Sequence, residues 1–211
     1  MLIDVLTAAV LVAVGVRLVG AARISMRQRA RVERIVRGVR WRHVWPAPLV
    51  LVAVGVVASL LLLVPGLDLG WWTLIGGAGN PVLGSTDQTS GTVLSWLVPA
   101  LFITLLLPAL PLFAEAEERM FRLGAEQWSA KRRLGKAVQF GLVHAIIGIP
   151  IGVALALSLG GLYFTHCYLR AWRHSASQGV ALLESTRAHF SYNAFVFVSV
   201  GVAIVVVALV G

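Results

Sequence analysis

The chain has 211 residues, of which 58% are hydrophobic and 13% are charged, and its formal net charge is +9. Soluble domains carry about 25% charged residues, so this composition excludes an ordinary soluble protein and indicates a multi-pass protein of the cell membrane. The bases cluster between apolar runs, as the positive-inside rule describes, and we therefore expect a lipid bilayer and no nucleic acid as partner.

The first apolar run, about residues 5–21, is predicted to be a retained membrane anchor that starts outside the cell. An acid precedes it and arginines follow it, which is the reverse of a signal peptide. Between Arg23 and Arg42 there are eight arginines and one acid, Glu33. Apolar residues at helical spacing predict a basic amphipathic helix on the inner leaflet in this stretch. A second span follows at about 46–65.

Residues 66–93 change character, because they are rich in Gly, Ser and Thr and contain no Lys or Arg. This composition predicts an extracytoplasmic loop. A third apolar run, about 94–118, contains three prolines, so we expect it to be kinked. It brings Glu115, Glu117 and Glu118 to its cytoplasmic end, where a second basic loop follows.

The stretch 137–169 decides the architecture, because it is either one helix or two helices that break at Gly148–Pro150. With one helix, the chain has five spans, and His189 lies at the opposite membrane face from Glu117. With two, it has six spans, and all 18 Lys and Arg residues lie on or near the cytoplasmic side. The six-span alternative also brings the polar motifs together, and we favour it on both the charge distribution and this convergence.

The sequence therefore predicts an all-α fold, a bundle of about six transmembrane helices with a site on the cytoplasmic side. We expect one integral membrane domain, residues 1–211, with both termini outside. Its amino-terminal spans occupy 5–65 and its motif-bearing helices 94–210. The bias toward Arg, Ala, Val and Gly is typical of a high-GC bacterium. The oligomeric state is not predicted by any feature of the sequence.

Three motifs place acid–base or hydrogen-bonding side chains in or beside apolar sequence, where such groups are costly and usually functional. They are Glu117-Glu118-x-x-Phe121-Arg122, Phe140-x-x-x-His144 and His189-x-x-x-Asn193. A carboxylate and two imidazoles supply the parts that activate a water molecule, and an amide is a neutral donor for a developing oxyanion.

Within the first motif, Glu118 and Arg122 are four residues apart on one helix, which favours an ion pair. Glu117 then points about 100° away and is left free to act as a base. Each motif alone has an ordinary explanation as a solvated helix end or as packing. We also expect Glu115 to pair with Arg119, and His43 to be solvated in the basic loop.

The three motifs in this order resemble the CPBP family of intramembrane proteases, which comprises type II CAAX prenyl endopeptidases and bacteriocin-processing and immunity proteins. The resemblance covers about residues 110–200. Phe121 before Arg122 adds to it, and so does the Gly-rich stretch 160–163. A leucine, Leu123, stands where a glycine commonly follows the arginine, and the amino-terminal half has no matching motif.

The resemblance implies a role for each matching residue. The base that activates water would be Glu117, together with His144. The oxyanion would be held by His189 and Asn193. The supporting residues would be Glu118, Arg122 and Phe140. No covalent acyl-enzyme, cofactor or metal would be required.

We therefore expect a glutamate-dependent intramembrane endopeptidase whose substrate is a membrane-associated peptide, a C-terminal tail or a leader peptide. The alternative is a non-catalytic bacteriocin-immunity or scaffold protein that binds a membrane peptide. A transporter with a proton relay is a third option, although the polar residues gather near one membrane face. A zinc hydrolase would use two histidines and a glutamate, but the chain has no H-E-x-x-H.

Overall fold

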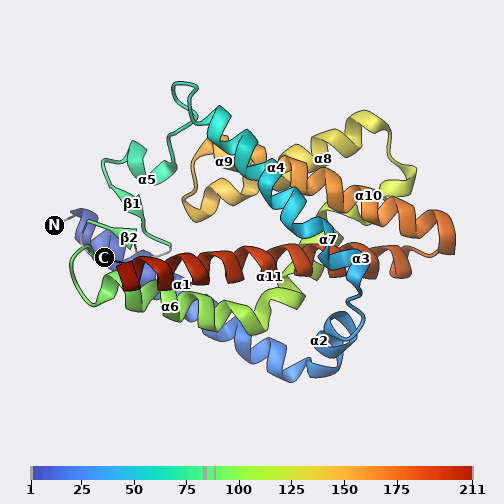
Figure 1. The fold of residues 1–211 in the computed structure, drawn as a ribbon, viewed down its shortest axis with the longest axis horizontal. Helices are drawn as coiled ribbons and strands as arrows, with labels where there is room; N and C mark the ends of the chain where they lie inside the picture. Colours follow the sequence, from blue (N-terminus) through green and yellow to red (C-terminus); the bar gives the residue numbers. More distant parts are fainter. Residues whose placement is uncertain (1, 83–84, 88, 211) are drawn as a thin grey trace.

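The computed structural model describes residues 2–82, 85–87 and 89–210 and shows an all-α protein (Figure 1). The all-α part of the expected fold is thus confirmed, with one short antiparallel pairing of two strands in a loop. Four helical segments of the described chain are long and apolar enough to cross a membrane: Leu2–Arg27, Trp41–Leu61, Leu94–Gln127 and Ile151–Ser175. The chain therefore has the helices of a membrane protein.

The elements follow one another as a series of helices, with 3-10 helices written η. The amino-terminal elements are α1 (Leu2–Arg27), α2 (Arg29–Val36), α3 (Trp41–Val44), α4 (Pro46–Leu61), α5 (Trp71–Leu74), β1 (Gly79–Asn80) and β2 (Ser85–Thr86). The carboxyl-terminal elements are α6 (Leu94–Leu106), η1 (Leu107–Ala109), α7 (Leu110–Arg122), η2 (Ala125–Gln127), α8 (Ala130–Val143), η3 (His144–Ile147), α9 (Ile151–Ala156), α10 (Ser158–Ser175) and α11 (Gln178–Val210).

The kink expected in the third apolar run is present. Helix α6 gives way to the 3-10 turn η1, which contains Pro108, and α7 then leaves in a new direction (Figure 1). A proline cannot donate the backbone hydrogen bond that would continue the α-helix. The bend turns α7, and with it the first motif, toward α10 and α11, which both contact it.

The stretch 137–169 is broken as expected. Helix α8 ends at Val143, and Gly148 has φ of 87°, a left-handed conformation that a glycine adopts without strain. The chain reverses between α8 and α10, which lie side by side (Figure 1). A single continuous helix over these residues is therefore excluded.

The loop before β1 covers this break and satisfies its backbone. The N–H groups of Ile151 and Gly152 donate to the carbonyls of Leu69 and Leu67 at 3.1 and 2.7 Å. These are first-turn N–H groups, which have no partner inside their own helix. A short helix beside a membrane needs its polar ends covered, and here a loop, not another helix, covers them.

The two ends of the chain lie at one end of the molecule (Figure 1). The connections that contain α2 and α3, that join α7 to α8 and that join α10 to α11 lie at the opposite end. Most of the bases are in or next to these connections. The arrangement separates a basic end from an end with few bases, which is the asymmetry that the positive-inside rule describes.

The amphipathic helix expected among the arginines is α2, but its apolar face contacts protein. Ile35 is 1% exposed, and α2 contacts both α7 and α11. Its main apolar anchor is therefore buried in the fold, whereas Val36 beside it stays exposed, and the position of this helix on the leaflet stays a prediction.

The prediction that His43 is solvated is wrong. Its side chain is buried in α3, where Nδ1 accepts a hydrogen bond from the backbone N–H of Arg40 at 2.9 Å. The other ring nitrogen, Nε2, therefore donates to Oε2 of Glu184 at 3.0 Å. Because Glu184 is on α11, this contact joins the two halves of the chain.

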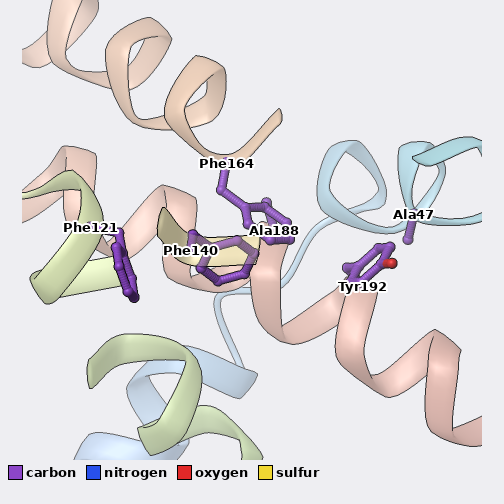
Figure 2. Packing of buried hydrophobic residues seen from close by; sticks show 6 residues of the cluster. All are labelled: Ala47, Phe121, Phe140, Phe164, Ala188 and Tyr192. Carbon is purple, nitrogen blue, oxygen red and sulfur yellow. The ribbon is translucent and has the colours of Figure 1, made fainter. Parts of the chain in front are cut away.

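An aromatic cluster forms the centre of the fold (Figure 2). Its buried members come from five helices and are Ala47, Phe121, Phe140, Phe164, Ala188 and Tyr192. Helix α10 approaches α8 closely, because a Cβ atom on Gly161 would lie 3.0 Å from the carbonyl oxygen of Ala137. The cluster holds α7, α8, α10 and α11 together around the three motifs.

Candidate functional site

A buried ion pair forms the base of the site. Nη1 of Arg122 lies 3.1 Å from Oε1 of Glu118, and neither side chain is exposed. This is the i, i+4 pair that the sequence predicts. Nδ1 of His189, on α11, donates to the same oxygen at 2.9 Å. The first and third motifs are therefore joined directly.

Arg122 extends this connection to α10 and α8. Its Nη2 donates to the carbonyl of Gly161 at 3.2 Å, and its guanidinium carbon lies 4.2 Å from the centre of the Phe140 ring. A cation over an aromatic face is attracted by the ring quadrupole. Arg122 thus ties α7 to two further helices.

Phe140 is the central ring of the site. Its centroid is 4.9 Å from that of His144 and 5.4 Å from that of His189, both in edge contacts. The His189 ring also stacks on Phe164, with centroids 4.3 Å apart and an angle of 18° between the planes. The two histidines of the motifs are therefore held around one aromatic side chain, and the imidazole of His189 has a fixed orientation.

The two adjacent glutamates are in different environments, as expected. The side chain of Glu118 is fully buried and paired, whereas that of Glu117 is 32% exposed. Oε2 of Glu117 lies 3.5 Å from Nε2 of His189 and has no hydrogen-bond partner among the described residues. Glu117 is thus the carboxylate that remains available.

His144 lies in η3, next to the break in the chain. Its Nδ1 is 2.8 Å from the carbonyl oxygen of Phe140. A carbonyl accepts only, so Nδ1 carries the proton and Nε2 presents its lone pair. This tautomer suits a group that accepts a proton or orients a water molecule.

A cavity of about 770 Å³ brings the motif residues together. Its walls are mostly apolar and come from α1, α4, α6, α7, α8, η3, α9, α10 and α11. Five residues of the motifs line it: Glu117, Phe140, His144, His189 and Asn193. Glu118 and Arg122 lie outside the lining, where Glu118 accepts the hydrogen bond from His189 and pairs with Arg122. The structure thus places the candidate residues around one apolar space.

The sequence analysis did not single out Arg17, which also lines this cavity from α1. An arginine within an otherwise apolar run was the available signal, because such residues are expensive in a membrane and usually functional. Arg17 is the only Lys or Arg that the structure places in the lining. It adds a positive charge to a space whose walls are apolar apart from the motif residues.

No group of three or more His, Cys, Asp or Glu side chains in the described part of the chain is arranged to hold a metal ion. Comparison with protein-family models, curated proteins and solved structures finds no match to this chain. The interpretation of the site therefore depends on its own geometry and on the three motifs.

Proposed function

We propose that the protein is an intramembrane endopeptidase in which Glu117 and His144 activate a water molecule. The observation that carries this proposal is that Glu117, His144, His189 and Asn193, from three separate motifs, line one apolar cavity. A cavity with such walls suits an apolar peptide. The order and composition of the motifs support a place for the chain in the CPBP family of intramembrane proteases.

In the proposed reaction, a water oxygen attacks the carbonyl carbon of a peptide bond. Glu117 takes one proton from the water, while the lone pair on Nε2 of His144 orients it. The carbonyl oxygen becomes an oxyanion, to which His189 and Asn193 donate hydrogen bonds. The proton held by Glu117 then passes to the leaving nitrogen as the C–N bond breaks. No bond forms between the substrate and the protein.

The oxyanion role requires a proton on Nε2 of His189, the ring nitrogen that lies 3.5 Å from Oε2 of Glu117. Nδ1 already donates to Glu118, so a second ring proton makes the side chain a cation. With Arg122, the cluster then has two positive charges, which balance Glu117 and Glu118. Balanced charges are the arrangement that a low-dielectric environment tolerates best.

The cavity also indicates the kind of substrate. Its lining is apolar apart from the motif residues and Arg17. An apolar peptide segment would fill it, and the guanidinium of Arg17 would attract a carboxylate such as a chain end. The proposed substrate is therefore a membrane-associated peptide that is cleaved near a carboxylate.

We propose that the chain crosses the cell membrane six times, with its basic end on the cytoplasmic side. The basic end of the molecule supports this orientation. The test is a single exposed cysteine, Ser175→Cys, in a Cys167→Ala background. Ser175 ends α10 at the basic end. A membrane-impermeant maleimide should label it only after the cells are permeabilised, and labelling of intact cells would contradict the orientation.

The function itself is tested with purified protein in detergent and a pool of apolar peptides, with cleavage products measured by mass spectrometry. Glu117→Gln removes the base and should lower cleavage by at least about 100-fold. His144→Ala should do the same. Glu33→Gln is the matched control, because Glu33 pairs with Arg29 on α2, away from the cavity.

The outcomes separate the two candidate functions. Cleavage by the wild-type protein that survives Glu117→Gln would contradict the proposed mechanism. A wild-type protein that binds the peptides through the cavity and cleaves none would favour the non-catalytic immunity or scaffold alternative. In that case Glu117→Gln would leave binding unchanged.

A further inference from the structure

A second cavity, of about 690 Å³, lies between α1, α2, α7 and α11 and shares no lining residue with the first. Four guanidinium groups line it, those of Arg27, Arg31, Arg34 and Arg119. We call it the arginine cavity. Its lining includes one acid, Glu115, so the four arginines leave a net charge of +3.

Two of the arginines are held in place by Glu115. Nε of Arg31 lies 2.7 Å from one carboxylate oxygen, and Nη2 of Arg119 lies 3.0 Å from the other. The predicted pair with Arg119 is thus confirmed, and Arg31 adds a second partner from α2. Nη1 of Arg31 also donates to Gln28 at 3.0 Å. Each guanidinium has five N–H donors, so each keeps donors for a ligand.

The other two arginines have no acidic partner among the described residues. Arg27 ends α1, and Arg34 lies on the last turn of α2, with exposed side chains. By contrast, Arg29 at the start of α2 and Arg37 just after its end both lie beside Glu33, at 2.9 and 3.7 Å. Arg27 and Arg34, which have no acidic partner in the described part of the chain, are therefore both in the lining of the cavity.

The position of the cavity indicates the ligand. It follows directly on the apolar span of α1, where exposed Ile24 and Met26 face the surroundings. Its remaining walls include the apolar side chains of Leu123, Leu182 and Leu183. Arginines above apolar walls at the edge of a span are the setting in which membrane proteins bind phosphate headgroups.

We propose that the arginine cavity is a binding site for a phosphate group, which Arg27 and Arg34 contact and which Arg31 and Arg119 help to hold. The phosphate of a lipid headgroup and free phosphate share this chemistry. The site does not depend on the proposed peptidase activity, because its lining includes none of the motif residues.

The test measures the thermal unfolding midpoint of the full chain in detergent with short-chain phosphatidic acid, with sodium phosphate, and with the matching phosphatidylcholine. A ligand that binds the folded state raises the midpoint with concentration. Phosphatidic acid should raise it and phosphatidylcholine should not. A rise with phosphatidic acid alone identifies a lipid source, and a rise with sodium phosphate as well identifies free phosphate.

Two double variants remove the same charge from the same region. Arg27→Gln with Arg34→Gln should raise the apparent Kd at least about tenfold, because each arginine gives a charge-assisted hydrogen bond. Arg29→Gln with Arg37→Gln should bind as the wild type does. If both double variants lose binding equally, or if no phosphate compound raises the wild-type midpoint, the proposal is overturned.

A third variant blocks the cavity without a change in charge. Gly179 lines it at the start of α11, and a Cβ atom there would have only Oγ of Ser177 nearby, at 3.9 Å. Gly179→Leu should therefore fold normally and lose phosphate binding by a similar factor. Unchanged binding by this variant would place the phosphate elsewhere.

Discussion

Oε1 of Glu118 accepts a hydrogen bond from Nδ1 of His189 at 2.9 Å. The two residues are 71 positions apart in the chain, and both side chains are buried. The same oxygen faces Arg122 at 3.1 Å. A carboxylate thus lies between two donors in the centre of the bundle. This relationship makes Glu118 the residue on which both the stability of the site and the orientation of His189 depend.

Loss of the charge on Glu118 should destabilise the protein strongly. Glu118→Gln leaves Arg122 as a buried, unpaired cation, and breaking a buried pair in this way costs about 3–5 kcal/mol. The free energy of unfolding in detergent measures this cost. Glu33→Gln, in a pair at the protein surface, should change it by less than about 0.5 kcal/mol.

A double variant shows whether charge is the cause. Glu118→Gln with Arg122→Met removes both charges, and an apolar replacement of a buried ion pair is often neutral. The double variant should therefore be more stable than Glu118→Gln alone. Equal stability of the two would show that packing, not the unpaired cation, explains the loss.

Replacement of two glycines of α8 by alanine should change the stability of the protein in opposite directions. A Cβ atom on Gly141 would clash with the carbonyl oxygen of Ala154 and lie 2.6 Å from Oγ of Ser158, whereas one on Gly135 would meet nothing within 4 Å. Gly141→Ala should cost about 1–3 kcal/mol through overpacking. Gly135→Ala should stabilise the helix by roughly 0.5–1 kcal/mol.

Thermal unfolding of both variants measures the difference, and the same helix provides the control. A stable Gly141→Ala protein would contradict the close approach of α9 and α10 to α8. Helix α8 packs mainly against α10, so this result tests the main contact of α8.

Local spacing predicted the parts of this site that lie within one helix. The pair of Glu118 with Arg122 and the contact of Phe140 with His144 both follow from i, i+4 spacing. These two contacts depend on neighbouring residues alone, so a single sequence contains enough information to predict them. The break in 137–169 was different, because Gly148 and Pro150 marked only its place, and the choice of two helices depended on the charge asymmetry and on the convergence of the motifs.

Contacts between distant segments were not predictable in the same way. His43 was expected to be solvated, and the sequence around it gave no sign of burial. Its partner, Glu184, comes 141 residues later in the chain. The partner of Glu115 on α2, Arg31, is 84 residues away. Such pairings depend on how whole helices pack, which hydrophobic spacing does not specify.

The carboxylate of Glu184 should make stability depend on acid pH. Burial raises the pKa of Glu184, whereas hydrogen bonds from His43 and Arg187 and the charge of Arg42 lower it. The lowering effects together exceed the effect of burial, so the pKa lies below its ordinary value of 4.5. A lowered pKa means that the folded state binds protons less readily than the unfolded state. This contribution is therefore present above pH 4.5 and is lost as the pH falls through the lower, folded value.

Unfolding midpoints measured against pH for the wild type and Glu184→Gln test this sign. The wild type should be the more stable protein above pH 4.5, and the difference should shrink below it. A difference that stays constant to low pH would mean that the ionised carboxylate is not what stabilises the contact between α3 and α11.

Asn193 offers the cleanest test of the oxyanion site. It lines the cavity, and its side chain is half-buried with no hydrogen-bond partner among the residues that the structure describes. Removal of a single oxyanion donor typically lowers kcat by about 100- to 1,000-fold. Asn193→Ala should therefore lower kcat by this factor and leave KM and the unfolding midpoint nearly unchanged.

The same measurement on His189 would be ambiguous, because His189 also stabilises the buried charge of Glu118. Phe195→Ala, on the same helix but outside the cavity lining, is the matched control for Asn193 and should keep full activity. If Asn193→Ala keeps its kcat, the amide does not contact the oxyanion. If it lowers the unfolding midpoint instead, its role is structural, because a donor reserved for the transition state contributes nothing to the folded protein alone.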